Sequence, residues 1–169
     1  MKDSNYYSAD ALINYVSNHK MPRYNVIPNV GLYLEQVVKY INEILEPFHL
    51  SITPSMLSNY VKKGYISRPI NKQYTADQIA YLIFIVVAKQ VLSMEHISKL
   101  LTLQKSTYSL DAAYNYFCEE LEYIVRMTFE KKSEHENISE NTAYEKTVLR
   151  SVVISVSHII YLNYCLENL

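Results

Sequence analysis

The sequence predicts a mostly helical, all-α fold. Its 169 residues include only two glycines and five prolines, which leaves little material for the tight turns of an all-β fold. Apolar residues recur at spacings of three and four over most of the chain, which is the pattern of amphipathic helices. Several of these runs begin with Thr or Ser, residues that cap helix N-termini. With 49% hydrophobic residues, the chain can bury a core of its own.

Seven segments have the apolar spacing of helices. In chain order they are 7–18, 34–46, 54–63, 75–91, 94–103, 110–132 and 143–166. The stretch "MPRYNVIPNVG" between the first two is a connector, because it contains two prolines and a glycine. Residues 67–74 are too short for a helix and contain a proline, so we expect a loop or a small β-hairpin there. The polar segment 131–141 predicts another loop.

Helix-end residues support the third and fourth helices. Thr53 is a good N-cap, and Pro54 fits the first helical position because its missing N–H costs no hydrogen bond there. Gly64 is a suitable C-terminal stop. Thr75 and Gln78 have the spacing of a capping box, and the helix that they begin is apolar nearly all round. We therefore expect that helix to be deeply buried.

The net charge of −1 is unevenly distributed. Residues 1–50 carry a net charge of −1, residues 51–105 carry +5, and residues 106–169 carry −5. A basic middle segment favours a polyanion as partner. Solvated helix faces also produce such charge blocks, so the charge pattern alone leaves both interpretations open.

Nothing in the residues predicts an enzyme or a cofactor. Cys118 and Cys165 lie far apart without metal-ligand spacing, which indicates reduced thiols in a cytoplasmic protein and no metal site. No HExxH, paired-carboxylate or nucleophile motif is present, so no catalytic residue is predicted. The apolar C-terminal run contains Arg150 and His158, which are costly in lipid. We therefore expect a buried or subunit-facing helix and no membrane partner.

Tyrosines crowd the C-terminal third of the chain. They are Tyr108, Tyr114, Tyr116, Tyr123, Tyr144, Tyr161 and Tyr164. One interpretation is core and interface packing at helical spacing. The other is an aromatic pocket for an unknown small-molecule effector, since tyrosine rings are rigid and amphipathic.

The order of segments from 34 to 103 is helix, turn, short capped helix, loop, long buried helix and short helix. Over residues 52–103 the sequence resembles the MerR family of winged helix-turn-helix proteins. The resemblance is carried by Tyr60, Gly64–Tyr65–Ile66, the wing 67–73, Tyr74–Thr75–Ala76–Asp77 and Ser93–Met94–Glu95–His96–Ile97. Most of the chain also resembles the YkrK-like family of bacterial proteins, which brings no activity with it. Three regions are implied: an N-terminal helix and connector (1–30), a winged helix-turn-helix domain (31–105) and a C-terminal helical dimerisation region (106–169).

The MerR resemblance implies a homodimeric, DNA-binding transcription regulator that reads double-stranded DNA with helix 54–63 and the wing 67–74. That helix would enter the major groove, where short polar side chains reach base edges and cations contact phosphates. The candidate base-reading residues are Ser55, Ser58 and Asn59. The candidate phosphate contacts are Lys62, Lys63, Arg68, Lys72 and the hydroxyl of Tyr74, whose ring is otherwise a packing group.

Departures from the MerR pattern keep a second hypothesis open. Members usually carry an arginine and an aromatic residue where this chain has Ser58 and Asn59, and a wing arginine where it has Lys72. No metal-binding cysteines follow the long C-terminal helix. The alternative is a protein–protein interaction module that has a MerR-like fold and has lost DNA binding.

Overall fold

The predicted mostly helical fold is confirmed by the computed structural model, which describes residues 9–130 and 143–167. The loop predicted over 131–141 lies outside the described residues. The helices are α1 (Ala9–Ser17), α2 (Leu34–Leu45), α3 (Pro54–Lys62), α4 (Ala76–Ala88), α5 (Met94–Thr107), α6 (Leu110–Phe129) and α7 (Tyr144–Glu167). Short 3-10 turns lie at η1 (Tyr24–Val26) and η2 (Glu46–Phe48), and two short strands are β1 (Leu32–Tyr33) and β2 (Gln73–Tyr74).

Helix α4 is the centre of the core, as its all-round apolar sequence predicts. Its capping box is present: the Thr75 hydroxyl accepts from the Gln78 N–H, and the Gln78 side chain accepts from the Thr75 N–H. Ten of its thirteen residues are buried. Helices α2, α6 and α7 all contact it, so one continuous core includes residues from every region of the described chain.

The two-stranded sheet was not predicted in full. A small hairpin at 67–74 was among the expectations, but β1 lies between the expected connector, which ends at Gly31, and the expected helix 34–46, where no strand was predicted. The strands are antiparallel, with Leu32 opposite Tyr74 and Tyr33 opposite Gln73. Gly31 has a φ of +76°, and a Cβ there would lie 3.1 Å from the Cβ of Gln73. Glycine at this position therefore permits both the turn into β1 and the close approach of the two strands.

Helix α5 is longer than the sequence predicts, because it continues from residue 103 to Thr107. The extra turn is polar and lacks apolar spacing, but it contains no Gly or Pro to end the helix. Side-chain hydrogen bonds stabilise this last turn of α5. The Gln104 amide N–H donates to the Tyr108 carbonyl at 2.9 Å, and the Thr107 hydroxyl donates to the Leu103 carbonyl at 2.9 Å.

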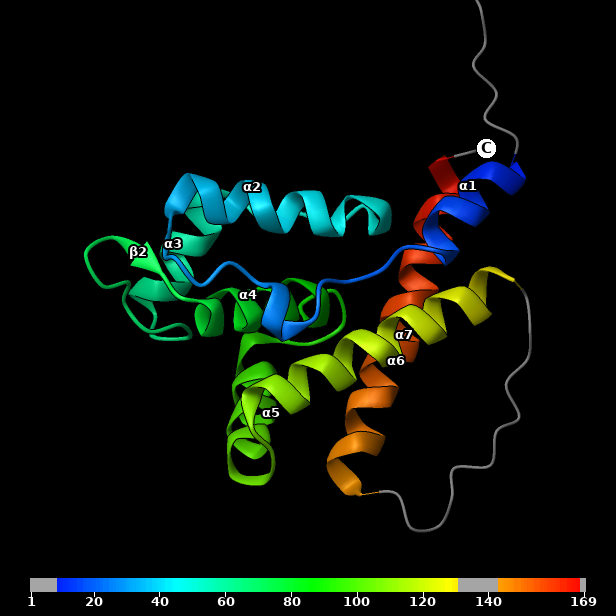
Figure 1. The fold of residues 1–169 in the computed structure, drawn as a ribbon. Coiled ribbons are helices and arrows are strands. Elements are labelled where there is room, and N and C mark those ends of the chain that lie inside the picture. Colours follow the sequence, from blue (N-terminus) through cyan, green and yellow to red (C-terminus); the bar gives the residue numbers. More distant parts are fainter. Residues whose placement is uncertain (1–8, 131–142, 168–169) are drawn as a thin grey trace, which may run out of the picture.

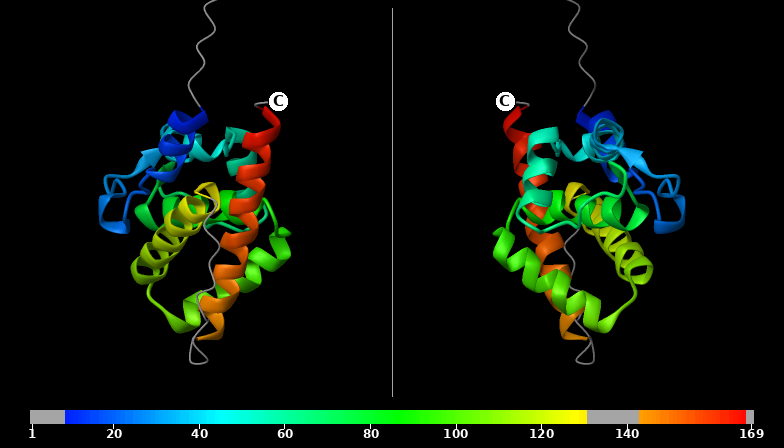
Figure 2. Two further views of the ribbon diagram at one scale, coloured as in Figure 1. Left: turned by 90° about the vertical axis from the view of Figure 1, so that its right-hand side faces the viewer. Right: turned by 90° about the vertical axis from the view of Figure 1, so that its left-hand side faces the viewer.

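The hairpin and α3 lie at one end of the molecule, and α1, α6 and α7 lie at the other (Figure 1). Helix α7 packs against α6, its most extensive partner, and crosses it at an angle (Figure 1, Figure 2). Among the described residues, α7 is the one helix long and apolar enough to cross a membrane by length and composition. It buries Val152, Val153, Val156, Ser157 and Ile160 inside the protein, which amounts to 28% of its most apolar window.

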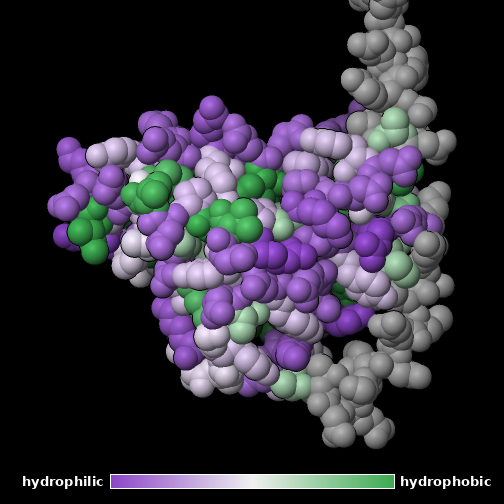
Figure 3. Space-filling view, viewed as in Figure 1, coloured by the Kyte–Doolittle hydropathy of each residue, from purple (hydrophilic) through white to green (hydrophobic). Residues whose placement is uncertain are grey.

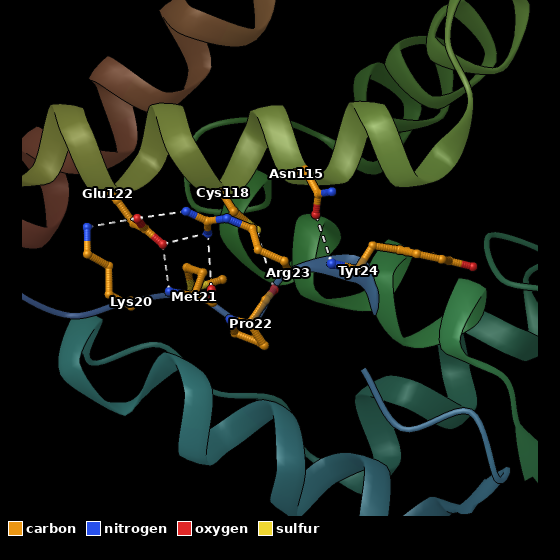
Figure 4. Close-up of polar contacts among 8 residues, drawn as sticks. All are labelled: Lys20, Met21, Pro22, Arg23, Tyr24, Asn115, Cys118 and Glu122. Atoms are coloured by element: carbon orange, nitrogen blue, oxygen red, sulfur yellow. Dashed lines mark hydrogen bonds and ion pairs between the residues drawn. The ribbon is translucent and has the colours of Figure 1, made fainter. Parts of the chain in front are cut away.

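The connector after α1 is fastened to α6 by one carboxylate (Figure 4). Glu122 accepts from both terminal guanidinium nitrogens of Arg23 at 2.7 and 3.0 Å, from the Met21 N–H at 2.7 Å and from the Lys20 ammonium at 3.2 Å. Two turns earlier in α6, the Asn115 side-chain oxygen accepts from the Tyr24 N–H at 2.8 Å. These contacts join segments about a hundred residues apart in sequence.

Candidate nucleic-acid interface

The start of α3 is fixed by a side chain of α2. The Asn42 amide donates to the Ile52 carbonyl at 3.0 Å and accepts from the Ile52 N–H at 2.8 Å. One residue further, the Thr53 hydroxyl accepts from the Met56 N–H at 3.2 Å, which confirms the predicted N-cap, and Pro54 occupies the first turn. Because α2 holds both backbone groups of Ile52, the direction in which α3 leaves the turn is set by α2.

Helix α3 has a buried and an exposed face. Leu57 and Tyr60 are its buried residues, and they belong to the main core. The exposed face contains all the residues that the sequence nominated on this helix and at its end: Ser55, Ser58, Asn59, Lys62 and Lys63. Gly64, at a φ of +78°, ends the helix as predicted.

The hairpin after α3 turns at two residues with left-handed backbone. Ile70 and Gln73 exchange both backbone hydrogen bonds, at 3.1 and 2.8 Å. Between them, Asn71 and Lys72 have φ values of 50° and 64°, as in a type I′ turn, where Asn and Gly are the usual residues. A lysine in this conformation is uncommon and strained by about 1 kcal/mol or more. Lys72 is thereby held at the exposed tip of the hairpin.

Polar contacts from α4 hold the hairpin in place. The Gln78 amide donates to the Ser67 carbonyl at 2.9 Å and to its hydroxyl at 3.1 Å, so the capping-box residue also anchors the first residue of the hairpin segment. The Tyr24 hydroxyl donates to the Asp77 carboxylate, and this hydrogen bond raises the pKa of Tyr24 to about 12. The connector and the hairpin are thus both tied to the first turn of α4.

The segment 51–75 is an uncompensated basic region. It contains Lys62, Lys63, Arg68 and Lys72 and no Asp or Glu. All four cations are exposed, and none forms an ion pair with any residue in the part of the chain that the structure describes. A local charge of +4 that no described acidic residue neutralises is available to an anionic surface.

Tyr74 differs from the other seven candidate residues because it is 5% exposed and part of the core. Its position as the β2 partner of Leu32 explains why, since one side of the small sheet faces the core. Its ring is therefore a packing group, as the sequence predicts.

Sequence reasoning missed two features near the basic region. The Lys89 ammonium lies 5.7 Å from the centre of the Tyr60 ring, although Lys89 follows α4 and has no local sequence pattern that points to α3. Apolar side chains are also exposed around the hairpin and connector: Val26, Val30 and Ile70. The corresponding end of the molecule has apolar groups among hydrophilic ones (Figure 3).

The remaining chemistry-bearing residues are cysteines, possible metal ligands and tyrosines. Cys118 is buried, and burial raises the pKa of its thiol to about 12, so it is no nucleophile near neutral pH. In residues 9–130 and 143–167 there is no group of three or more His, Cys, Asp and Glu side chains that could hold a metal ion. The predicted tyrosine cluster divides: Tyr161 and Tyr164 pack on Phe129, whereas Tyr108, Tyr114 and Tyr116 line a cavity.

Comparison with known proteins places the chain in a family. No curated protein and no solved structure matches it. The family model described as a domain of unknown function, DUF1836, matches residues 22–117. This range begins in the connector, includes the hairpin and α3, and ends within α6, so it covers more than half of the chain. The protein therefore belongs to the DUF1836 family.

Proposed function

We propose that the protein is a homodimeric transcription regulator with a MerR-like winged helix-turn-helix, which binds duplex DNA through α3 and the hairpin. The observation that carries the proposal is the exposed set Lys62, Lys63, Arg68 and Lys72, which has no ion-pair partner among residues 9–130 and 143–167. In this arrangement α2 and α3 are the helix-turn-helix and residues 67–74 are the wing. Lys72 supports the assignment of residues 67–74 as a DNA-contacting wing. It is a cation at a strained hairpin tip, where Gly or Asn is the preferred residue.

The division of roles follows from side-chain chemistry. The lysines and Arg68 would contact phosphates, which position the protein on the duplex without selecting a sequence. Ser55, Ser58 and Asn59 would face the base edges, and an Asn amide can make two hydrogen bonds to adenine. Leu57 and Tyr60 pack the buried face of α3 against the core. The orientation of α3 in the groove would therefore be fixed by the orientation of the whole domain.

Salt dependence tests the proposal. We expect affinity for a random-sequence duplex to fall steeply with salt, and the slope to be shallower by roughly two to three units in Lys62→Ala/Arg68→Ala/Lys72→Ala, since each phosphate contact contributes about 0.9. Fluorescence anisotropy across a salt series measures both slopes. The triple variant Lys39→Ala/Lys99→Ala/Lys105→Ala removes the same charge from exposed positions on α2 and α5 and controls for net charge.

Two results would count against DNA binding by this surface. One is no binding even at low salt, and the other is the same slope for both triple variants. A protein–protein interaction module is the second candidate function, and the exposed apolar side chains of the connector and hairpin, Val26, Val30 and Ile70, favour it. An apolar contact of that kind would keep its affinity as salt rises.

The dimer is proposed from the outer face of α7. Ile154, His158, Leu162 and Leu166 follow one another at intervals of four and are all exposed. A mainly apolar stripe on a helix that is already packed on its other side is typical of a subunit contact, and a two-fold axis would present two α3 helices to successive half-sites.

We expect Leu162→Glu to convert the dimer to a monomer, because Leu162 is 57% exposed and the charge would be buried opposite its symmetry mate. Light scattering coupled to size exclusion measures the mass. Asn163→Glu is the matched control, since the neighbouring residue is also exposed but lies off the stripe. A monomeric wild type, or dissociation by both variants alike, would contradict this interface.

A further inference from the structure

A cavity of about 250 Å³ lies between helices α4, α5, α6 and α7. It reaches the surface, since Tyr108, which is 39% exposed, is among its lining residues. A dry apolar cavity of about 150 Å³ is enough to bind benzene. In the same proportion, this cavity has room for about ten carbon atoms.

Aliphatic and aromatic side chains share the walls of the cavity. Leu101 of α5 and Leu149 of α7 line it together with Phe84 of α4 and Phe117 of α6. Leu101, Leu149 and Phe84 are apolar and yet only partly buried. Covering such side chains removes apolar surface from water, which stabilises the covered state in proportion to the area. A ligand that is apolar over most of its surface therefore fits these walls, whether it is aliphatic or aromatic.

Two polar side chains of the lining offer a ligand no hydrogen bond. The Oε1 of Gln104 and the hydroxyl of Tyr114 are buried, with almost no accessible surface. The Gln104 amide nitrogen donates to the Tyr108 carbonyl at 2.9 Å. A ligand in the cavity is therefore held mainly by apolar contact.

Both charged side chains of the lining belong to the first turn of α7. They are Glu145 and Lys146, one acid and one base. The Lys146 ammonium lies 4.9 Å from the centre of the Tyr116 ring, where a cation–π contact stabilises it. Because the two charges have opposite signs, the lining favours no net charge on the ligand. An uncharged ligand also enters without the cost of removing a charge from water.

The size of the cavity favours a small molecule over a protein segment. Helical and extended segments bind in long grooves that accept several side chains in a row. A volume of about 250 Å³ accepts only about one large side chain. The walls come from four helices, and concave, mostly apolar sites of this kind are typical of small-molecule binding.

We propose that the cavity binds an uncharged, apolar molecule of about ten carbon atoms, and that hydrophobic contact supplies the affinity. The proposal is independent of DNA binding, because none of the lining residues belongs to α3 or the hairpin.

Straight-chain alcohols from butan-1-ol to dodecan-1-ol are suitable probes, because they differ only in apolar length. We expect the dissociation constant to fall about fourfold for each added methylene. The fall should stop at about ten carbon atoms, since further methylenes would remain in water once the cavity is full. Titration of the full chain, followed by the methyl NMR signals of Ala80 and Ala113, measures each constant and locates the ligand, because both alanines line the cavity.

Substitutions in the wall should move the chain length at which the affinity stops rising. Ala113→Leu fills part of the cavity and should move this limit to shorter alcohols, whereas Leu101→Ala enlarges the cavity and should move it to longer ones. Ala11→Leu is the matched control, since it adds the same atoms at an exposed position on α1, which does not line the cavity. The control should keep the wild-type limit.

Three results would overturn the proposal. The first is that the wild-type protein binds no alcohol up to its solubility. The second is an affinity that rises with every methylene without a limit, which would indicate an open apolar surface suited to a protein partner. The third is a wall variant that folds, as its melting temperature shows, and keeps the wild-type limit. Since the two wall variants change the volume in opposite directions, either one alone decides this last point.

Discussion

Arg23→Met is expected to lower the free energy of unfolding by about 3 kcal/mol at neutral pH. The substitution takes from Glu122, which is 6% exposed, the guanidinium that donates two hydrogen bonds to it. Removing one partner of a buried pair costs about 3–5 kcal/mol. We expect the low end because the Met21 N–H and the Lys20 ammonium still contact the carboxylate. Urea unfolding followed by circular dichroism measures the loss.

Lys20→Met is the matched control for this prediction. It removes the same charge from the same carboxylate, but the Lys20 side chain is 66% exposed whereas that of Arg23 is 31% exposed. A contact screened by solvent contributes at most about 1 kcal/mol. Equal losses in the free energy of unfolding of the two variants would contradict the prediction, because they would mean that burial does not decide the strength of these contacts.

The pH dependence of the same pair has a definite sign. Burial alone would raise the pKa of Glu122, but the hydrogen bonds from Arg23, Met21 and Lys20 outweigh it, and the pKa lies below its usual value. The pair therefore stabilises the folded state above the ordinary Glu pKa of about 4.3, and this contribution is lost as the pH falls through the lowered pKa. The difference between wild type and Arg23→Met should accordingly shrink in acid.

Local sequence signals predicted the elements that depend on local chemistry. The Thr53 cap with Pro54 gave the start of α3, and the Thr75–Gln78 capping box gave the start of α4, because each needs only residues within one turn. The exposed face of α3 was predictable for the same reason, since apolar spacing alone separates Leu57 and Tyr60 from the polar positions.

The features that the sequence did not predict depend on partners far away in the sequence. Strand β1 is two residues long and exists because Leu32 meets Tyr74, so it has no periodicity of its own to detect. Glu122 is one of several acids in an acidic helix, and its partners lie about a hundred residues earlier. The second role of Gln78, holding Ser67, is likewise invisible in the capping box. Such contacts are determined by packing, which a single sequence does not encode locally.

The second large effect is expected at the buried face of α3. Leu57 is fully buried and is one of only two buried residues in this helix of nine. Leu57→Ala should lower the free energy of unfolding by about 2–5 kcal/mol, since it removes buried apolar volume where few other side chains hold α3 to the core. Tyr60→Phe is the control on the same face: its hydroxyl is buried without a hydrogen-bond partner in the described residues, so stability should stay equal or rise.

Substitutions on the exposed face of α3 should affect DNA binding and leave the free energy of unfolding nearly unchanged. Asn59→Ala is expected to change the free energy of unfolding by no more than about 0.5 kcal/mol. If α3 reads base edges, the same variant should bind an operator selected from a random library about tenfold or more weakly, because a good base contact is worth about 1–3 kcal/mol. Binding to a random duplex should stay unchanged. A large loss of stability in Asn59→Ala would show instead that this face packs against something, and would favour a protein partner on α3.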